Sequence, residues 1–342
     1  MPDLEKSTVE LGYIPLLDCV ALLWAEQRGF FQQHGLTVNL VRETSWASLR
    51  DRLAYGFLDA AHCLSAMLPA ALLGQDQLGV PLQTPLVLSQ NRAYISLSQA
   101  LCYRLHITAQ DSPRSSAEKV LHALQTESLQ FAHVFPDSIH HYCLRQWLAL
   151  ADAERAKLLP LKTLAPPFMA QALSEKKIDG FCVGEPWNSQ AALSGCGQIV
   201  LSSQAIIPQI ADKVLAVTEE WAQQHPNTLA ALCAAIQQAQ QELTQLEDLT
   251  AVWQMLQQHN IIQFECNASV HVHTYHHIQQ IIRQMIGDSN QPQVQDFEWL
   301  ISQIQHWESL PDLTESLHSL AQRCVVNSAS KLAEFPLSNH TV

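Results

Sequence analysis

The stretch SWASLRDRLAYGFLDAAHCLSAMLPAALLG, residues 45–74, decides the fold class. From Trp46 onward, apolar side chains recur at helical spacing with charged residues between them, which predicts an amphipathic helix. Gly56 favours a helix stop, because glycine takes left-handed backbone geometry easily. Residues 58–64 are short and apolar enough for a buried parallel strand, and residues 66–73 predict a second helix. This order predicts an α/β fold, in which ligands bind beyond the carboxyl ends of the strands.

Residues 167–195, PFMAQALSEKKIDGFCVGEPWNSQAALSG, repeat the pattern of the first stretch. An amphipathic helix again precedes a short apolar strand, and an Ala-Ala-Leu helix again ends at glycine. Chance could supply one such match, since small residues and Leu-Asp pairs are common in α/β proteins. A structural repeat is nevertheless favoured, and two similar lobes with a cleft between them are the expected architecture.

Length and charge limit the class of protein. The chain has 342 residues, which exceeds one typical core and suits two α/β lobes or one lobe with a helical extension. Its net charge of -13 and its 19 scattered Lys and Arg residues argue against direct contact with nucleic acid, which needs clustered positive charge. No run approaches about eighteen apolar residues, so no segment is expected to span a membrane.

The compartment is inferred from the N-terminal sequence and from the cysteines. Residues 1–7 are short and polar, and the first strand pattern begins at Thr8, so no room for a secretory signal is expected. Nine cysteines lie mostly in apolar runs and form no CxxC pair. Such a set is typical of free buried thiols in a reducing cytosol, so we expect a cytoplasmic location.

Three polar side chains fall beside predicted strand ends. Trp46 follows a strand and opens a helix, where backbone N–H groups favour an anion, although a hydrophobic staple or a core position explains it equally well. His140 lies in the first turn of a helix after the strand 129–134, and a structural histidine is the commoner case. Lys213 opens the strand KVLAVT, where base rates favour an exposed strand end.

The run VLSQNRAYISLS, residues 87–98, predicts a strand that ends in polar Ser98 and Gln99. From Thr218 onward the spacing is helical, in residues 229–243, 249–259, 275–286 and 294–309. The expected division of the chain is a first lobe of residues 8–97 and 205–325 with the C-terminal helices, a second lobe of residues 98–204, and a loose tail of residues 326–342.

The common enzyme signatures are missing, since no Walker loop, GxGxxG after a strand, GxSxG elbow or HExxH is present. Residues 271–277, HVHTYHH, resemble a metal-binding tract, because several imidazoles could meet at one ion. The tract has no acidic or cysteine partner at diagnostic spacing, and a polar loop that enters a helix explains it as well. Neither a metal nor a cofactor is expected.

Four runs resemble the nitrate-binding proteins of bacterial and cyanobacterial ABC transporters, the NrtA type, within the wider nitrate, sulfonate and bicarbonate solute-binding group. They are ELGYIPLLDCVALLWAEQRGFF, WASLRDRLAYGFLDAAHCLSAMLPAAL, IDGFCVGEPWN and DKVLAVTEEW. The resemblance covers about residues 8–310. It implies a two-lobed type II periplasmic-binding-protein fold that clamps a ligand between its lobes, and it does not imply an enzyme.

The anion site of that family, carried over by matching motif, falls on Trp46 of the SWAS run, His140 of the DSIHHY run and Lys213 of the DKVLAV run. Gln99, after the strand ISLS, is a looser match. Cationic, imidazole, indole and amide donors suit nitrate, which is planar, monoanionic and only accepts hydrogen bonds. The bicarbonate branch is understood to place Glu where this chain has Lys213, so binding of nitrate or nitrite without calcium is expected. Asn91-Arg92 departs from the Asn-Gly of many relatives.

The expected absence of a leader separates two functions within this resemblance. The chain resembles the cytoplasmic NasS-type nitrate and nitrite sensors, which hold an RNA-binding, NasT-like antiterminator protein inactive until the anion binds. The implied function is therefore a sensor with an antiterminator-type partner. A transport protein whose leader has been removed is the alternative. An enzyme of the thiamin-pyrimidine synthase type shares the fold but needs a His- and Cys-rich motif that this sequence lacks.

Overall fold

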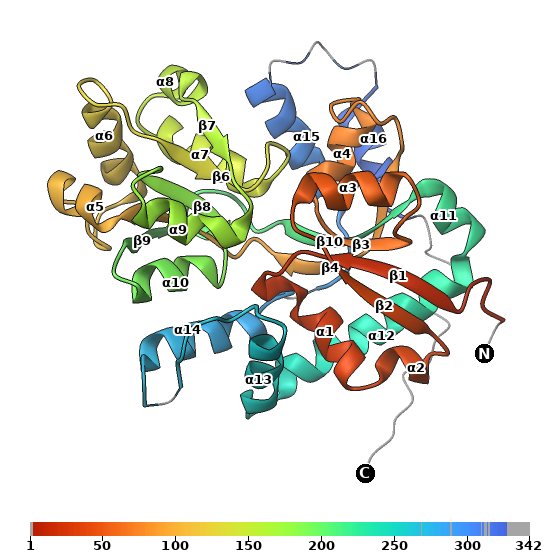
Figure 1. The fold of residues 1–342 in the computed structure, drawn as a ribbon. Helices are drawn as coiled ribbons and strands as arrows, with labels where there is room; N and C mark the ends of the chain where they lie inside the picture. Colours follow the sequence, from red (N-terminus) through yellow and green to blue (C-terminus); the bar gives the residue numbers. More distant parts are fainter. Residues whose placement is uncertain are drawn as a thin grey trace.

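The computed structural model describes residues 3–267, 269–287, 289–308, 310, 313 and 315–326. They form two α/β lobes, as the sequence predicts, and each lobe is built on a five-stranded sheet (Figure 1). Of the predicted loose tail, only Val326 is described, and its N–H donates to Thr84 O at 3.0 Å; residues 327–342 lie outside the described part. Among the described helices, none has the length and apolar character that crossing a bilayer requires.

The first sheet has the strand order β2-β1-β3-β10-β4. Strand β1 lies parallel to β2 and β3, and β10 runs antiparallel to β3 and β4. The bounds are β1 (Thr8–Tyr13), β2 (Thr37–Arg42), β3 (Ala60–Leu64), β4 (Leu82–Gln90) and β10 (Ala211–Thr218). β3 is buried along its whole length and β10 almost so, which suits the continuous apolar runs that form them.

Helices cover both faces of the first sheet. Figure 1 shows α3, α4, α15 and α16 on one side and α1, α2 and α12 on the other. The helices of this lobe are η1 (Leu17–Cys19), α1 (Val20–Gln27), α2 (Phe30–Gln33), α3 (Trp46–Ala54), α4 (Met67–Leu72), α11 (Glu219–Gln224), α12 (Pro226–Gln245), α13 (Thr250–Gln258), α14 (Val272–Arg283), α15 (Val294–Glu308) and α16 (Leu317–Arg323). The predicted helical character of the C-terminal third is confirmed.

The second sheet has the strand order β7-β6-β8-β5-β9. Its strands are β5 (Ala93–Ser98), β6 (Phe131–His133), β7 (Leu161–Thr163), β8 (Gly180–Gly184) and β9 (Gly197–Ser202). Its helices are α5 (Gln99–Leu105), α6 (Pro113–Ala123), α7 (Ile139–Ala149), α8 (Ala153–Leu158), η2 (Pro166–Phe168), α9 (Met169–Ser174), α10 (Trp187–Leu193) and η3 (Ser203–Ala205).

The predicted structural repeat is confirmed. The order α3, β3, α4 in the first lobe corresponds to α9, β8, α10 in the second. The strand of each repeat also occupies the same place in its sheet: β3 lies between parallel β1 and antiparallel β10, and β8 lies between parallel β6 and antiparallel β5. The two lobes are therefore similar in topology as well as in sequence pattern.

The chain crosses between the lobes at two adjacent points. It leaves the first sheet through Asn91 and Arg92, and it returns just before β10. The two crossing segments bind each other, since Asn91 N–H donates to Ile210 O at 3.0 Å and Ile210 N–H donates to Asn91 Oδ1 at 3.1 Å. The strand predicted within residues 87–98, which ends at Ser98, is β5, and it belongs to a different sheet from β4. Residues 93–97, expected in the first lobe, accordingly lie in the second.

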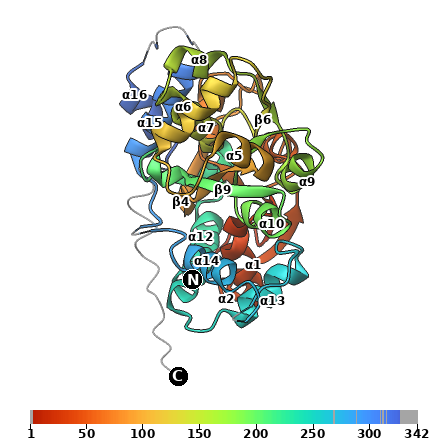
Figure 2. The same cartoon turned by 90° about the vertical axis from the view of Figure 1, so that its left-hand side faces the viewer.

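Helix α15 also joins the two lobes. It packs against α4 of the first lobe and α7 of the second, and Gln146 Nε2 of α7 donates to Gln303 Oε1 of α15 at 2.7 Å. Figure 1 shows α15 between α7 of the second lobe and α4 of the first, and Figure 2 shows α15 and α7 in a view turned by 90°. Consistent with this bridge, one continuous cluster of buried apolar side chains extends from α3 and α4 through the second lobe to α15.

Candidate functional site

Trp46 is the first residue of α3 and follows β2 closely, as predicted. Ser45 fixes this helix start, because its side chain accepts from Ser48 N–H at 3.2 Å. The indole is only 1% exposed, and its Nε1 has no hydrogen-bond partner among the described residues. A buried donor without an acceptor is costly, so this N–H is available to an acceptor from outside the chain.

His140 lies in the first turn of α7, whose start is fixed by Ser138, the acceptor for His141 N–H at 3.2 Å. The ring is fully buried, and neither nitrogen has a hydrogen-bond partner in the described part of the chain. Burial, together with the charge of Lys213, holds the pKa of His140 well below its ordinary value. The imidazole is therefore neutral near pH 7, with one N–H donor and one acceptor nitrogen.

Lys213 lies within β10, opposite Leu64 of β3, and is completely buried. Its Nζ is 2.7 Å from Asp212 Oδ1 and 3.2 Å from Asp18 Oδ2. Burial alone would lower the pKa of Lys213, but the two neighbouring carboxyl groups raise it, so the side chain remains a cation. Neither contact has the geometry of a hydrogen bond, and the ammonium has no hydrogen-bond partner among the described residues.

The structure brings Trp46, His140 and Lys213 together at the interface of the lobes. Lys213 Nζ is 5.8 Å from the centroid of the Trp46 ring, and its charge acts directly on His140 of the second lobe. Asp18 marks the same interface, since a Cβ added to Gly184 of β8 would lie 3.5 Å from Asp18 Oδ2. The three residues come from three elements, α3, α7 and β10.

Gln99 is not part of this group. It opens α5, its side chain is exposed, and its N–H donates to Cys196 O at 3.0 Å. The physical reason is the direction of β5, which starts next to the interface at Ala93, paired with Gly184, and runs outward to Ser98. Gln99 therefore lies at the end of the strand that is remote from the other three predicted residues.

Three further polar residues, Asp18, His62 and Asp212, complete what we call the polar cluster, together with Trp46, His140 and Lys213. His62 of β3 places Nε2 at 2.9 Å from Asp18 Oδ1, and its ring centroid lies 5.8 Å from that of Trp46. Sequence reasoning missed all three. Asp18 lies beyond the carboxyl end of β1, so the rule that selected Trp46 also applies to it. His62 and Asp212 had no comparable signal.

The two carboxyl groups of the polar cluster differ in protonation. Burial alone would raise the pKa of Asp18, but Lys213 and His62 hold it well below its usual value, so Asp18 is ionised. Burial raises the pKa of Asp212 to about 6, with the charge of Asp18 acting in the same direction and that of Lys213 against it. One firm carboxylate, one cation and one weaker acid thus share a site that is closed to water.

In the part of the chain that the structure describes, no group of three or more His, Cys, Asp or Glu side chains could hold a metal ion. His277 of α14 places Nε2 at 3.0 Å from Glu185 Oε1 of the second lobe. Its ring also lies against Tyr94, with centroids 5.1 Å apart. The tract therefore contributes a contact between the lobes.

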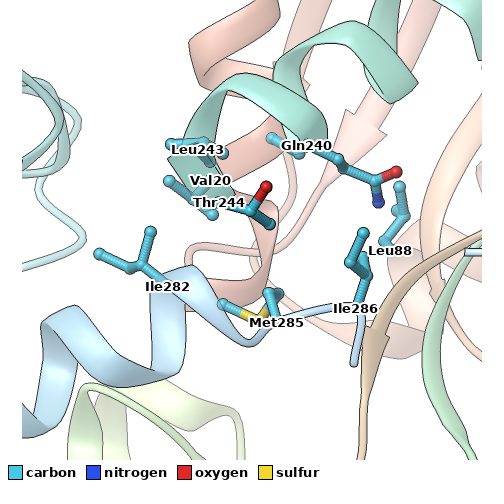
Figure 3. A pocket seen from close by; sticks show the side chains of 9 residues that line it. Val20, Leu88, Gln240, Leu243, Thr244, Ile282, Met285 and Ile286 are labelled. Carbon is cyan, nitrogen blue, oxygen red and sulfur yellow. The ribbon is translucent and has the colours of Figure 1, made fainter. Parts of the chain in front are cut away.

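A separate small pocket lies within the first lobe (Figure 3). Its lining is almost entirely apolar and comes from α1, β4, α12, α14 and the residues after α14, with Val20, Leu88, Leu243 and Ile282 among its members. Gln240 also lines it, but its Nε2 donates to Val87 O at 2.9 Å. The pocket contains none of the polar cluster, and it offers no charge to a small ion.

Curated relatives are transport proteins. The chain is 33% identical over 348 residues to the bicarbonate transport ATP-binding protein CmpC of Synechocystis sp., which covers 96% of this chain and 50% of that protein. It is 30% identical over 245 residues to the nitrate/nitrite binding protein NrtA of Nostoc sp., which covers 70% of this chain and 54% of that protein. The chain thus spans about half the length of the curated relatives it matches.

A solved structure has the same fold. The periplasmic nitrate-binding protein NrtA from Synechocystis superposes with a TM-score of 0.77 at 23% identity, over 94% of this chain and 87% of that chain. The predicted two-lobed periplasmic-binding-protein fold is thereby confirmed, as is the resemblance to NrtA. The NrtA relatives are named as binding proteins, in agreement with the expectation that this chain is not an enzyme. Residues 3–257, well over half of the chain, match the model of the NMT1-like family, and the chain belongs to that family.

Proposed function

We propose that this chain binds nitrate or nitrite between its two lobes, and that Trp46, His140 and Lys213 hold the anion. The observation that carries the proposal is a set of buried nitrogen donors from both lobes that lack hydrogen-bond partners. A planar monoanion that only accepts hydrogen bonds would satisfy them. The names of the NrtA relatives, which are nitrate or nitrate/nitrite binding proteins, support this choice of anion.

The placement of the donors also favours negative charge. Trp46 and His140 each lie in the first turn of a helix, where free backbone N–H groups and the helix dipole attract anions. Lys213 adds a full positive charge, and neutral His140 adds a donor without the desolvation cost of a second buried cation. Two donor positions from the first lobe and one from the second would let the anion hold the lobes together.

Hydrogen carbonate is the second candidate ligand. The relative CmpC is named as a bicarbonate transport protein. The polar cluster also contains acceptors, since Asp18 Oδ1 and Asp212 Oδ1 have no hydrogen-bond partner in the described part of the chain. The O–H of hydrogen carbonate could donate to one of them, which nitrate cannot do. Nitrate remains our first choice, because Lys213 supplies the positive charge without a calcium ion.

Isothermal titration calorimetry tests the proposal. We expect binding heat with nitrate or nitrite in the absence of calcium, and none after Lys213→Glu, because a third carboxylate would face the anion in a buried site. Lys177→Glu is the matched control, since this lysine is exposed and its substitution should leave binding unchanged. Circular dichroism must show that both variants are folded. Heat from bicarbonate that depends on calcium, with none from nitrate, would contradict the choice of anion.

We further propose that the chain is a cytoplasmic sensor that releases an antiterminator-type, NasT-like regulator when the anion binds. The cysteines support a cytosolic location, because all nine are free thiols and eight of them are buried. A sensor of this kind requires the anion and the regulator to prefer different conformations of the two lobes, and each must then weaken the binding of the other.

A pull-down from cytosol, with and without nitrate, tests the sensor function. We expect a regulator to be retained without nitrate and released as nitrate rises, while Lys213→Glu retains it at every nitrate concentration. A transport protein would bind nitrate equally well but would retain no cytosolic partner. If nothing is retained, or if the retained protein is not released by nitrate, the sensor function is wrong and the binding function stands.

A further inference from the structure

Charge balance in the polar cluster poses a problem for any bound monoanion. Asp18 and Asp212 are 7% and 2% exposed, and both lie within 3.2 Å of the single buried ammonium of Lys213. If both carboxyl groups are ionised, these three residues already carry one net negative charge. A monoanion at Lys213 would add a second charge to a site that is shielded from water, which is strongly unfavourable.

Five other titratable side chains face the pair of Asp212 and Lys213 from four neighbouring elements. They are Asp18 of η1, His62 and Cys63 of β3, His140 of α7 and Cys182 of β8. Each of the two thiols already carries its proton, because burial raises the pKa of Cys63 to about 12 and that of Cys182 well above its usual value. His140 resists protonation and Asp18 resists it more firmly still. Of the carboxyl groups in the polar cluster, Asp212 is the one that can accept a proton.

Geometry favours Asp212 over His62. Asp212 Oδ1 is the carboxyl oxygen nearest to Lys213 Nζ, at 2.7 Å, and it has no hydrogen-bond partner among the described residues. His62 instead contacts Asp18, with its Nε2 atom 2.9 Å from Asp18 Oδ1. An anion beside Lys213 would therefore act most strongly on the carboxyl group of Asp212.

We propose that Asp212 takes up one proton from solvent when a nitrate-type anion binds at Lys213. The inference rests on the proposed function. The proton removes one negative charge from the polar cluster, so the bound state keeps the charge that the free state had. It also converts Asp212 from an acceptor into an O–H donor, which matches a ligand that only accepts hydrogen bonds. Anion and proton then bind together and are released together.

Linkage between the two equilibria has a direct consequence for affinity. Asp212 in the free protein has a pKa of about 6, so above this pH each bound anion requires a proton from solvent. The dissociation constant for nitrate should therefore rise about tenfold for each pH unit above that value. Below it, Asp212 is already protonated and the affinity should level off. Hydrogen carbonate, which brings its own O–H, should show a smaller dependence.

Calorimetry of the intact protein at pH 7.5, in two buffers of different ionisation enthalpy, measures the protons taken up per anion. We expect about one proton per nitrate for the native chain, and about none for Asp212→Asn, whose nitrate affinity should not vary with pH. Asp137→Asn is the matched control, because burial, with the charge of Glu308, raises the pKa of Asp137 to about 7, and its substitution should leave the uptake unchanged.

Each other outcome overturns the proposal. Nitrate heat without proton uptake in the native chain contradicts it and leaves the proposed function intact. Uptake that persists in Asp212→Asn, or that disappears in His62→Asn or Asp137→Asn instead, assigns the proton elsewhere. If Asp212→Asn does not fold, difference infrared spectra of the native protein with nitrate must show a new protonated carboxyl band. No heat from nitrate, nitrite or bicarbonate would refute the proposed function and this inference together.

Discussion

Individual residues of the polar cluster are arranged at a cost to stability. Trp46 and His140 bury polar nitrogen atoms without hydrogen-bond partners among the described residues, and Lys213 buries a full charge. Loss of either carboxylate would leave that charge poorly compensated, and breaking a buried ion pair typically costs about 3–5 kcal/mol. Such groups are expected where a ligand supplies the missing interactions, because a site built for binding is rarely built for stability.

His140→Leu tests this trade-off. The apolar side chain has a similar size and removes two unpartnered ring nitrogens, so the free energy of unfolding should rise by about 1 kcal/mol. Nitrate affinity should fall by roughly tenfold or more, because a hydrogen bond to a charged group is lost. Urea denaturation and calorimetry measure the two effects. His133→Leu is the control and should lower stability, since His133 contacts His141 Nδ1 at 3.0 Å and Thr163 Oγ1 at 3.1 Å.

The pH dependence of stability carries the same information. The pKa of His140 is lower in the folded chain than in the unfolded chain, so the unfolded state binds more protons below about pH 6.5. The native chain should therefore lose stability as the pH falls below that value. In His140→Leu the loss of stability should be smaller, because one group that takes up a proton on unfolding is missing. An unchanged slope would mean that His140 is not held neutral.

At the scale of elements, two helix starts place two of the proposed ligands. Ser45 and Ser138 accept hydrogen bonds from the backbone of α3 and α7. Each cap ends the preceding extended segment and begins the helix at a defined residue. Ser138 also donates its hydroxyl hydrogen to Phe135 O at 2.5 Å, which fixes the turn between β6 and α7. The position of His140 follows from these short-range bonds.

Ser138→Ala should therefore affect both stability and binding. Loss of the cap should lower the free energy of unfolding by about 1 kcal/mol and weaken nitrate binding, because the first turn of α7 carries His140. Ser112→Ala is the matched control: Ser112 caps α6 by accepting from Ser115 N–H at 3.1 Å, but it is exposed and outside the polar cluster. It should lower stability by a similar amount and leave calorimetric affinity unchanged. Equal nitrate affinities for the two variants would show that the cap at Ser138 does not influence the binding site.

For the whole molecule, a few contacts join the lobes around the polar cluster. Glu185 is almost fully buried and meets His277 of α14 at 3.0 Å. On another part of the interface, the Arg50 guanidinium lies 5.8 Å from the centroid of the Phe135 ring. Ligand affinity depends on the fraction of molecules in which both lobes can contact the anion, so contacts remote from the anion contribute to binding.

His277→Ala tests this coupling without a change in the polar cluster. Loss of a contact worth about 0.5–1 kcal/mol should weaken nitrate binding by roughly two- to fivefold, with the unfolding temperature little changed. Small-angle scattering should show a larger radius of gyration without nitrate. His276→Ala, an exposed neighbour on the same helix, is the control and should match the native chain. A native-like affinity for His277→Ala would show that this contact does not influence the lobes.

The sequence determined the local features of this protein. Capping serines, helical periodicity and short apolar runs placed Trp46, His140 and Lys213 beside the ends of strands, because these signals depend on neighbouring residues only. The same kind of signal predicted the repeated helix, strand and helix of the two lobes. Two lobes and a set of candidate donors were therefore predictable without coordinates.

Tertiary structure decided which strands pair and in which direction. The strand predicted to end at Ser98 lies in the second sheet, because the chain leaves the first sheet at Asn91-Arg92, and the outward direction of β5 leaves Gln99 on the surface. Asp18 contacts both His62 and Lys213 only because β1, β3 and β10 meet in one sheet. Local sequence patterns do not encode such long-range pairing, because its free energy comes from burying surfaces that lie far apart in the chain.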